Sequence, residues 1–127
     1  MLDFSNSKIL IVGDVMLDKY YFGKVDRISP EAPVPIVNIQ KEESRLGGAS
    51  NVANNIVSLG GHSLLCGVIG HDLFGKEIER ISRHKNIDTF LLKTSSPTIT
   101  KARIIGGKQQ IVRVDYEDKS ELNADNK

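Results

Sequence analysis

Residues 8–18 read KILIVGDVMLD, and this stretch decides the fold class. Its apolar part, Ile9 to Val12, is continuous rather than alternating, which predicts a central strand over 8–13, buried on both faces of a parallel sheet. A carboxylate, Asp14, follows this strand immediately. Because α/β folds place ligands at the carboxyl ends of such strands, Asp14 is the first candidate binding residue. From its residue type alone, an aspartate that caps a turn is an equally good interpretation.

The periodicity beyond this stretch predicts alternating strands and helices. Apolar residues from Ala49 to Leu59 recur at the spacing of one helix face, which is typical of an amphipathic helix. A strand–helix–strand–helix–strand order favours an α/β fold with parallel strands. The elements expected for this part of the fold are strands over 8–13, 63–69 and 89–92, and helices over 50–59 and from Asp72 onward.

Other segments are rich in strand formers and lie outside this pattern. Residues 20–25 and 34–39 are expected to form strands, the second with one exposed face, and a proline-rich loop lies between them. Residues 99–105 and 109–114 flank Gly106-Gly107, which predicts an antiparallel hairpin.

Residues 45–53, RLGGASNVA, carry a second candidate site at the start of the expected helix. Gly47 and Gly48 suit a tight turn, or a close approach of the backbone to a ligand. The phosphate-loop pattern, with lysine and serine or threonine after the second glycine, is absent, so a nucleotide site is not expected here. Asn51 suits a helix cap, and its amide both donates and accepts hydrogen bonds, as polyol recognition requires.

The composition is that of an ordinary globular domain. The 127 residues are 39% hydrophobic and 26% charged, and the net charge of +1 gives no electrostatic case for nucleic acid or a membrane surface. Cys66 is the single cysteine, so no internal disulfide is possible, and the three histidines show no metal-ligand spacing. No signal peptide and no membrane-spanning run is evident. We therefore expect a cytoplasmic protein with neither a metal site nor a nucleic-acid or membrane partner.

The two segments quoted above resemble the sugar-binding half of the ribokinase-like (PfkB) carbohydrate kinases. Three further stretches are similar to the members that phosphorylate D-glycero-β-D-manno-heptose 7-phosphate: RISPEAPVP at 27–35, TITKAR at 98–103 and QQIVRVD at 109–115. The resemblance implies ATP-dependent phosphorylation of the anomeric hydroxyl to heptose 1,7-bisphosphate, for ADP-heptose and lipopolysaccharide core synthesis.

The resemblance also implies an architecture and a missing part. The α/β units would belong to a three-layer ribokinase-like fold, with a β-strand lid over the sugar at about 19–41 and 98–115 and a homodimer formed through this lid. The family's second motif, Asp-Thr-x-Gly-Ala-Gly-Asp, supplies the catalytic base and does not occur here. We therefore expect residues 1–127 to be the N-terminal, sugar-binding part. ATP and Mg²⁺ would then bind to the complete enzyme only, and this chain alone would not turn over ATP.

The family pattern assigns candidate roles to residues of this chain. Asp14 matches the acidic residue that binds sugar hydroxyls, whereas Asp18, the second acid of the motif, is favoured as a structural residue. A sugar phosphate needs cationic or amide donors, so at least one hairpin cation is expected to approach it. The expected substrate-binding residues are Asp14, Gly47, Gly48, Asn51, Lys101, Arg103, Gln109, Gln110 and Arg113, and none of these is catalytic.

Two other functions fit the same residues. A PfkB kinase acting on another sugar or on a nucleoside would share Asp14, Gly47, Gly48 and Asn51, but would not need the stretches at 27–35 and 109–115. A non-catalytic sugar-binding or dimerisation module is also supported by the missing catalytic motif. Comparing phosphorylation of different acceptor sugars by a longer protein distinguishes the first alternative from a heptose 7-phosphate kinase. Dimerisation without sugar binding would identify the second alternative.

Overall fold

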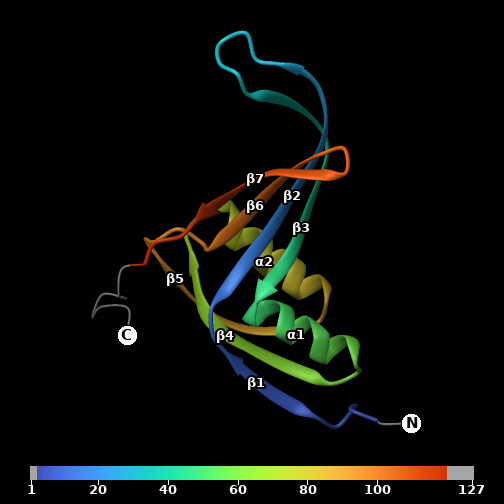
Figure 1. The fold of residues 1–127 in the computed structure, drawn as a ribbon. Helices are drawn as coiled ribbons and strands as arrows, with labels where there is room; N and C mark the ends of the chain where they lie inside the picture. Colours follow the sequence, from blue (N-terminus) through green and yellow to red (C-terminus); the bar gives the residue numbers. More distant parts are fainter. Residues whose placement is uncertain (1–2, 120–127) are drawn as a thin grey trace.

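The protein is described here from a computed structural model that covers residues 3–119, which fold into two β-sheets and two helices (Figure 1). The strands and helices follow one another in an order that mixes both sheets. They are β1 (Lys8–Val12), β2 (Val15–Ile28), β3 (Pro35–Gly48), α1 (Ala49–Ser58), β4 (His62–Gly70), α2 (Leu73–His84), β5 (Asp88–Thr94), β6 (Thr100–Gly106) and β7 (Gln109–Tyr116).

The first sheet is parallel, with the order β1-β4-β5. This confirms the α/β class predicted from the alternation of strands and helices. Helices α1 and α2 pack on one face of the sheet, where Leu65 and Ile69 are buried. The opposite face is apolar and exposed: Leu10 is 61%, Val12 73% and Phe90 74% accessible.

One prediction about β1 is wrong. The continuous apolar run indicated a central strand, but β4 is central and β1 is an edge strand among the described residues. Only Ile11 packs against the core, because nothing in residues 3–119 covers the face that carries Leu10 and Val12. The continuous apolar run shows that both faces of β1 are hydrophobic, but it does not show whether other elements of the protein cover both faces.

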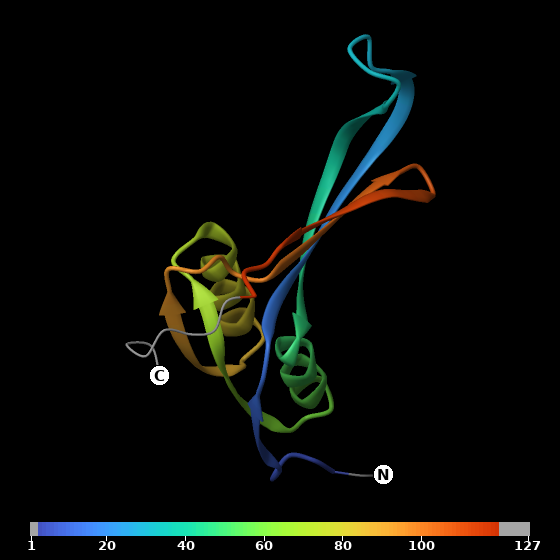
Figure 2. The same cartoon turned by 60° about the vertical axis from the view of Figure 1, so that its left-hand side comes forward.

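The second sheet has the order β3-β2-β6-β7 and is called the arm sheet below. Strands β2 and β3 are antiparallel and each 14 residues long, so their hairpin extends well beyond the body of the protein (Figures 1 and 2). The expected strand 20–25 is the central part of β2, whereas the expected strand 34–39 begins one residue before β3 and covers only its start. The expected hairpin is confirmed as β6 and β7, which pair antiparallel on either side of Gly107 and Lys108.

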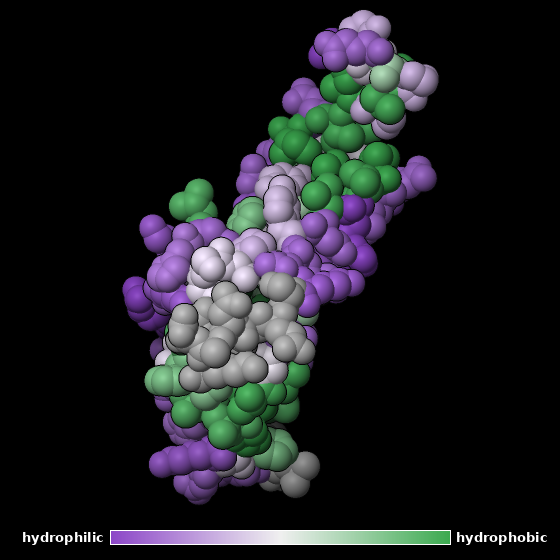
Figure 3. All heavy atoms as spheres, turned by 90° about the vertical axis from the view of Figure 1, so that its left-hand side faces the viewer, coloured by the Kyte–Doolittle hydropathy of each residue, from purple (hydrophilic) through white to green (hydrophobic). Residues whose placement is uncertain are grey.

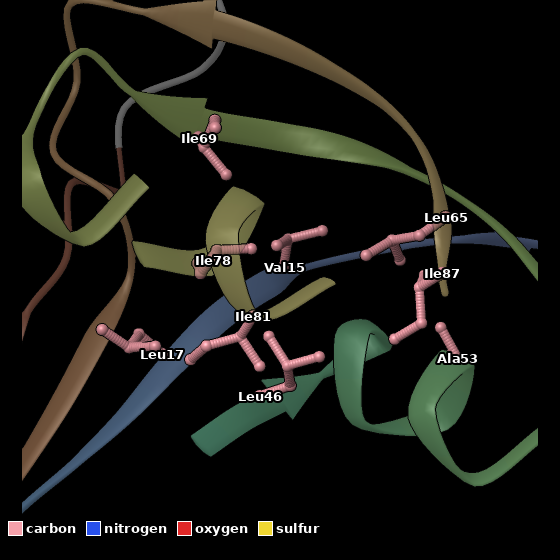
Figure 4. Close-up of a cluster of buried hydrophobic side chains, with 9 residues drawn as sticks. All are labelled: Val15, Leu17, Leu46, Ala53, Leu65, Ile69, Ile78, Ile81 and Ile87. Carbon is pink, nitrogen blue, oxygen red and sulfur yellow. The ribbon is translucent and has the colours of Figure 1, made fainter. Parts of the chain in front are cut away.

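The hydrophobic core joins the two sheets through the helices (Figure 4). Ile81 of α2 lies beside Leu17 of β2 and Leu46 of β3, so the base of the arm sheet packs on α2. Ala53 of α1 and Leu65 of β4 belong to the same buried cluster. One core therefore fixes the arm sheet relative to the parallel sheet.

A polar cluster at Asp72 makes a second connection between the sheets. Asp72 caps α2 by accepting a hydrogen bond from the Gly75 N–H at 2.8 Å. Its carboxylate also accepts from the backbone N–H of Thr98 at 2.8 Å and from the Thr98 hydroxyl at 2.7 Å. That hydroxyl in turn accepts from the Gly70 N–H at 2.9 Å. The cluster thus anchors the segment that leads into β6.

Candidate acceptor site

A polar hollow lies where the arm sheet meets the helices. It encloses about 610 Å³. Asp18 of β2 and Asn51 of α1 both line it, although they are far apart in sequence. The other lining residues are Tyr20, Glu43, Ser44, Arg45, Leu46, Asn54, Ile81 and Lys85. Carboxylate, amide and hydroxyl groups therefore surround one space, as recognition of a polyol requires.

Asp18 is placed in this hollow by the register of the arm sheet. It is paired with Arg45 on β3 and with Lys101 on β6. Residues opposite one another in a sheet share a face, so all three belong to the same face. The Asp18 carboxylate accepts from Arg103 Nη1 at 2.9 Å, and both side chains are 22% exposed. This hydrogen bond raises the pKa of the Arg103 guanidinium further above its already high ordinary value.

Gly47 allows the Asp18 carboxylate to occupy its position. A Cβ atom at residue 47 would lie 2.7 Å from Asp18 Oδ2 and 2.9 Å from the Met16 side chain, closer than such atoms approach. Gly48 is constrained by its own backbone, with φ of 54°, and a Cβ there would lie against the Asp14 carbonyl oxygen. Both glycines are therefore required by close contacts within the protein, and their approach to a ligand stays a prediction.

Asn51 lies in the first turn of α1, and Gly48 is the N-cap residue. The cap receives no side-chain hydrogen bond. Instead the Ser50 hydroxyl donates to the carbonyl oxygens of Gly47 at 2.6 Å and Met16 at 3.2 Å. Because Asn51 is exposed and does not cap the helix, its amide is available to the hollow.

Asp14 lies at the carboxyl end of β1, as expected, but it lines a different and smaller hollow of about 180 Å³. Thr94 and Ile99 line the same space. The Thr94 side chain is buried, and its hydroxyl has no hydrogen-bond partner among residues 3–119. The Asp14 carbonyl oxygen accepts from the Ala49 N–H at 2.9 Å. Asp14 therefore lies beside the start of α1, whereas Asp18 and Asn51 line the larger hollow together.

The predicted hairpin residues are distributed along the arm sheet. Arg103 is half-buried beside Asp18. Lys101 is also half-buried and lies two residues earlier on β6, closer to the body of the protein. Arg113 is exposed on the outer strand and forms an ion pair with Asp115 at 2.9 Å. Gln109 and Gln110 lie at the start of β7, at the far end of the hairpin, and do not line the hollow.

Two residues of this face were missed from sequence, Tyr20 and Arg45. Tyr20 is on β2, which lies between β3 and β6. The guanidinium carbons of Arg45 and Arg103 are 4.6 and 5.3 Å from the centroid of its ring. Arg45 is immediately before the diagnostic Leu-Gly-Gly stretch, and Tyr20 is two residues after Asp18. Alternation along a strand could have indicated that Asp18 and Tyr20 share a face.

The start of α1 does not have the residues of a phosphate loop. The start of α1 has no lysine for a phosphate, and the Ser50 hydroxyl is engaged by backbone carbonyls. Within residues 3–119, no group of three or more His, Cys, Asp or Glu side chains could hold a metal ion. Across the same residues, no helix is long and apolar enough to span a membrane.

The sequence model of the pfkB family carbohydrate kinases matches residues 6–126, and this chain belongs to that family. Among curated proteins, it is 50% identical over 118 residues to the D-beta-D-heptose 7-phosphate kinase of Bordetella bronchiseptica, covering 92% of this chain and 38% of that protein. It is 53% identical over 120 residues to the bifunctional protein HldE of Helicobacter pylori strain P12, covering 93% of this chain and 26% of that protein. The chain therefore spans only a quarter to two fifths of these relatives.

Solved structures agree on the fold. A carbohydrate kinase from Agrobacterium tumefaciens superposes with a TM-score of 0.70 at 18% identity, over 85% of this chain and 34% of that one. A fructokinase with bound ATP from Xylella fastidiosa gives a TM-score of 0.64 at 22% identity, over 87% of this chain and 33% of that one. The fold is ribokinase-like, and this chain covers part of it.

Proposed function

We propose that this chain is the N-terminal, acceptor-binding part of an ATP-dependent kinase for heptose 7-phosphate. The observation that carries the proposal is that Asp18, with Gly47 against its carboxylate, and Asn51 meet at one polar hollow, in a chain about half identical to proteins named as heptose kinases. The phosphate acceptor would be the anomeric hydroxyl, and the product would enter ADP-heptose and lipopolysaccharide core synthesis.

In this proposal the residues of the hollow bind and orient the sugar. The Asp18 carboxylate accepts hydrogen bonds from sugar hydroxyls, and the Asn51 amide both donates and accepts. Gly47 lets the carboxylate and the backbone come close to the sugar ring. Phosphoryl transfer depends chiefly on positioning and charge stabilisation, so holding the acceptor hydroxyl in position contributes substantially to catalysis.

The groups that bind ATP and catalyse phosphoryl transfer are proposed to lie outside this chain. ATP supplies the phosphoryl group in this family, and Mg²⁺ would neutralise its charge, but residues 3–119 offer neither a phosphate loop nor a metal cluster. We therefore place the nucleotide, the metal and the catalytic base outside this chain, in the part of the relatives that it does not cover. Cytoplasmic localisation is proposed with this function.

The arm sheet is proposed as the lid over the sugar and as the contact with a second copy of the chain. Its face opposite Asp18 carries exposed apolar side chains: the strand register puts Val25, Ile39, Val112 and Val114 there, each 39–45% exposed. Figure 3 shows hydrophobic side chains gathered along the projecting arm. Exposed apolar patches of this kind are typical of protein–protein interfaces. A dimerisation module therefore remains the second candidate for the isolated chain.

The test is a calorimetric titration of the 127-residue chain with heptose 7-phosphate, using Asp18→Asn and the matched surface variant Asp115→Asn. Asp115 also pairs with an arginine but lies on the outer strand. We expect binding to the unmodified chain, a loss of about tenfold or more in Asp18→Asn, because a hydrogen bond to a charged group is broken, and no loss in Asp115→Asn. Equal affinity of both variants and the parent would overturn the proposal.

A further inference from the structure

A buried hydroxyl group at the carboxyl end of the parallel sheet has no hydrogen-bond partner within the described residues. It belongs to Thr94, the last residue of β5, which is only 3% exposed. Its Oγ1 atom meets no donor or acceptor within residues 3–119. Burial removes the hydrogen bonds that a hydroxyl makes to water, so native proteins pair nearly all such groups. The unpaired hydroxyl therefore indicates a partner that is not among these residues.

The position of Thr94 distinguishes it from the other unpaired buried hydroxyls of the described residues, Ser63 and Ser82. Ser82 lies inside α2, and Ser63 is the second residue of β4, at the amino end of that strand. In α/β folds, ligands bind beyond the carboxyl ends of the parallel strands. Of these three side chains, only Thr94 lies at such an end, so a ligand is the expected partner of its hydroxyl.

All three parallel strands border the hollow that Thr94 lines. β4 is the central strand and contributes Val68, Asp14 follows β1 on one side, and Thr94 ends β5 on the other side. The volume of about 180 Å³ is far above the roughly 10–15 Å³ that one water molecule needs. Whole ligand pockets enclose about 300–1,000 Å³. The hollow therefore has room for one end of a small ligand.

The polar groups of the hollow suit a neutral, hydroxyl-bearing end of a ligand. Its charged lining residues are Asp14 and Asp118, whose carboxylates repel a phosphate. The Ser96 hydroxyl donates to Asp118 at 3.3 Å. A carboxylate only accepts hydrogen bonds, whereas the Thr94 hydroxyl both donates and accepts. Two adjacent hydroxyls of a polyol match this pair, because one can donate to Asp14 while the other pairs with Thr94.

The same lining favours a polyol over a metal ion. Within residues 3–119, no group of three or more His, Cys, Asp or Glu side chains could hold a metal. The remaining lining residues of the hollow are mostly apolar: Val68, Ile69, Pro97 and Ile99. Apolar walls with a few convergent polar groups are typical of sites for small organic ligands.

The Gly47-Gly48 turn connects this hollow with the larger one. A Cβ atom at residue 47 would meet the Asp18 carboxylate, and one at residue 48 would meet the carbonyl oxygen of Asp14. The two aspartates therefore lie against consecutive residues, immediately before α1 begins at Ala49. An acceptor sugar bound beside this turn is adjacent to both hollows.

We propose that Thr94 binds a hydroxyl group of the acceptor sugar and determines specificity for adjacent hydroxyls at the end of the sugar that enters this hollow. The inference rests on the proposed function and adds a residue of β5 to the acceptor site. The Thr94 hydroxyl gains its hydrogen-bond partner when the sugar binds. Removing this hydroxyl should therefore weaken binding without weakening the fold.

The test is Thr94→Val, which replaces the hydroxyl by a methyl group, in calorimetry and thermal unfolding of the 127-residue chain. Without a ligand, the variant should melt at or above the melting temperature of the parent, because it loses only an unpaired buried polar group. Its affinity for heptose 7-phosphate should fall about fivefold or more. Its affinity for unphosphorylated heptose should fall by the same factor, because the lost contact is with a hydroxyl and not with the phosphate.

Two control variants separate the hydroxyl from its surroundings. Ser82→Ala removes another unpaired buried hydroxyl, inside α2 and outside the lining of the hollow, so it should keep the melting temperature and both affinities of the parent. Thr94→Ser keeps the hydroxyl and loses the methyl group, so its affinity for both sugars should stay within about twofold of the parent.

Several results would overturn the proposal. Unchanged affinity in Thr94→Val, or an equal loss in Ser82→Ala, would show that the hydroxyl does not contact the sugar. A melting temperature of Thr94→Val below that of the parent would show that the hydroxyl is already paired in the folded protein, as by a trapped water. A loss for the phosphorylated sugar alone would assign the contact to the phosphate. If neither sugar binds the parent, the proposed function fails as well, whereas binding that Thr94→Val leaves unaltered refutes this inference alone.

Discussion

Removing the Asp72 carboxylate should destabilise the protein more than most surface changes, because one side chain serves both sheets. Asp72→Ala deletes the cap of α2 and two hydrogen bonds to Thr98, which is fully buried. Loss of an N-cap costs about 1 kcal/mol. Loss of a charged acceptor from a buried donor costs about 1–3 kcal/mol, at the lower end here because Asp72 itself is partly exposed. The expected total is about 3 kcal/mol, or a melting temperature lower by about 10 °C.

The pH dependence follows from the same contacts. Burial alone would raise the pKa of Asp72, but the hydrogen bonds from the Thr98 N–H, the Gly75 N–H and the Thr98 hydroxyl together lower it below its ordinary value. A carboxyl whose pKa is lower in the folded state contributes stability that is complete above its unfolded pKa and is lost as the pH falls. The difference between the parent and Asp72→Ala should therefore be constant near neutrality and shrink below about pH 4.

Urea unfolding at pH 7 and pH 3 measures both quantities. Thr98→Val serves as the second variant, because it leaves the Gly70 N–H without its acceptor and should cost about 2 kcal/mol. If the two residues act together, the double variant loses less than the sum of the single losses. A loss below about 0.5 kcal/mol in Asp72→Ala, the range of an ordinary surface substitution, or strict additivity would refute the reasoning.

Two further predictions concern the hollow and the arm sheet. In Gly47→Ala the new Cβ would meet Asp18 Oδ2 at 2.7 Å and displace the hydrogen-bonding carboxylate. Calorimetry should therefore show sugar affinity reduced about tenfold. Unchanged affinity would refute the role of Gly47. Val112→Lys places a charge on the exposed apolar face, so sedimentation should show a monomer where the parent self-associates, and an unaltered dimer fraction would exclude this face as the interface.

The sequence was sufficient for the parts of the fold that depend on local pattern. The helix expected over 50–59 is observed at Ala49–Ser58, and the expected start of α2 at Asp72 is its N-cap. The hairpin around Gly106-Gly107 was predicted from turn chemistry and strand propensity, and Gly107 has the positive φ of 63° that such turns favour. These features depend on residues close together in the chain.

The features that were missed depend on pairing between distant strands. The placement of Asp18 was missed, because Val15 begins another strand, whose alternation directs Asp18 to the face of Arg45 and Arg103. Sugar binding by Asp14 stays a prediction. The register that joins these residues cannot be read from any one segment. The edge position of β1 was missed for a related reason, since an apolar run does not reveal which neighbours are present.

We propose that this chain binds a phosphorylated sugar between the arm sheet and α1. The most direct measurement is an amide proton–nitrogen correlation spectrum of the labelled 127-residue chain, titrated with heptose 7-phosphate. We predict dispersed peaks, with shifts concentrated at Asp18 and Asn51, which line one hollow, and at Gly47 and Arg103, which contact the Asp18 carboxylate. Unresponsive peaks, or shifts confined to surfaces away from these residues, would contradict the account.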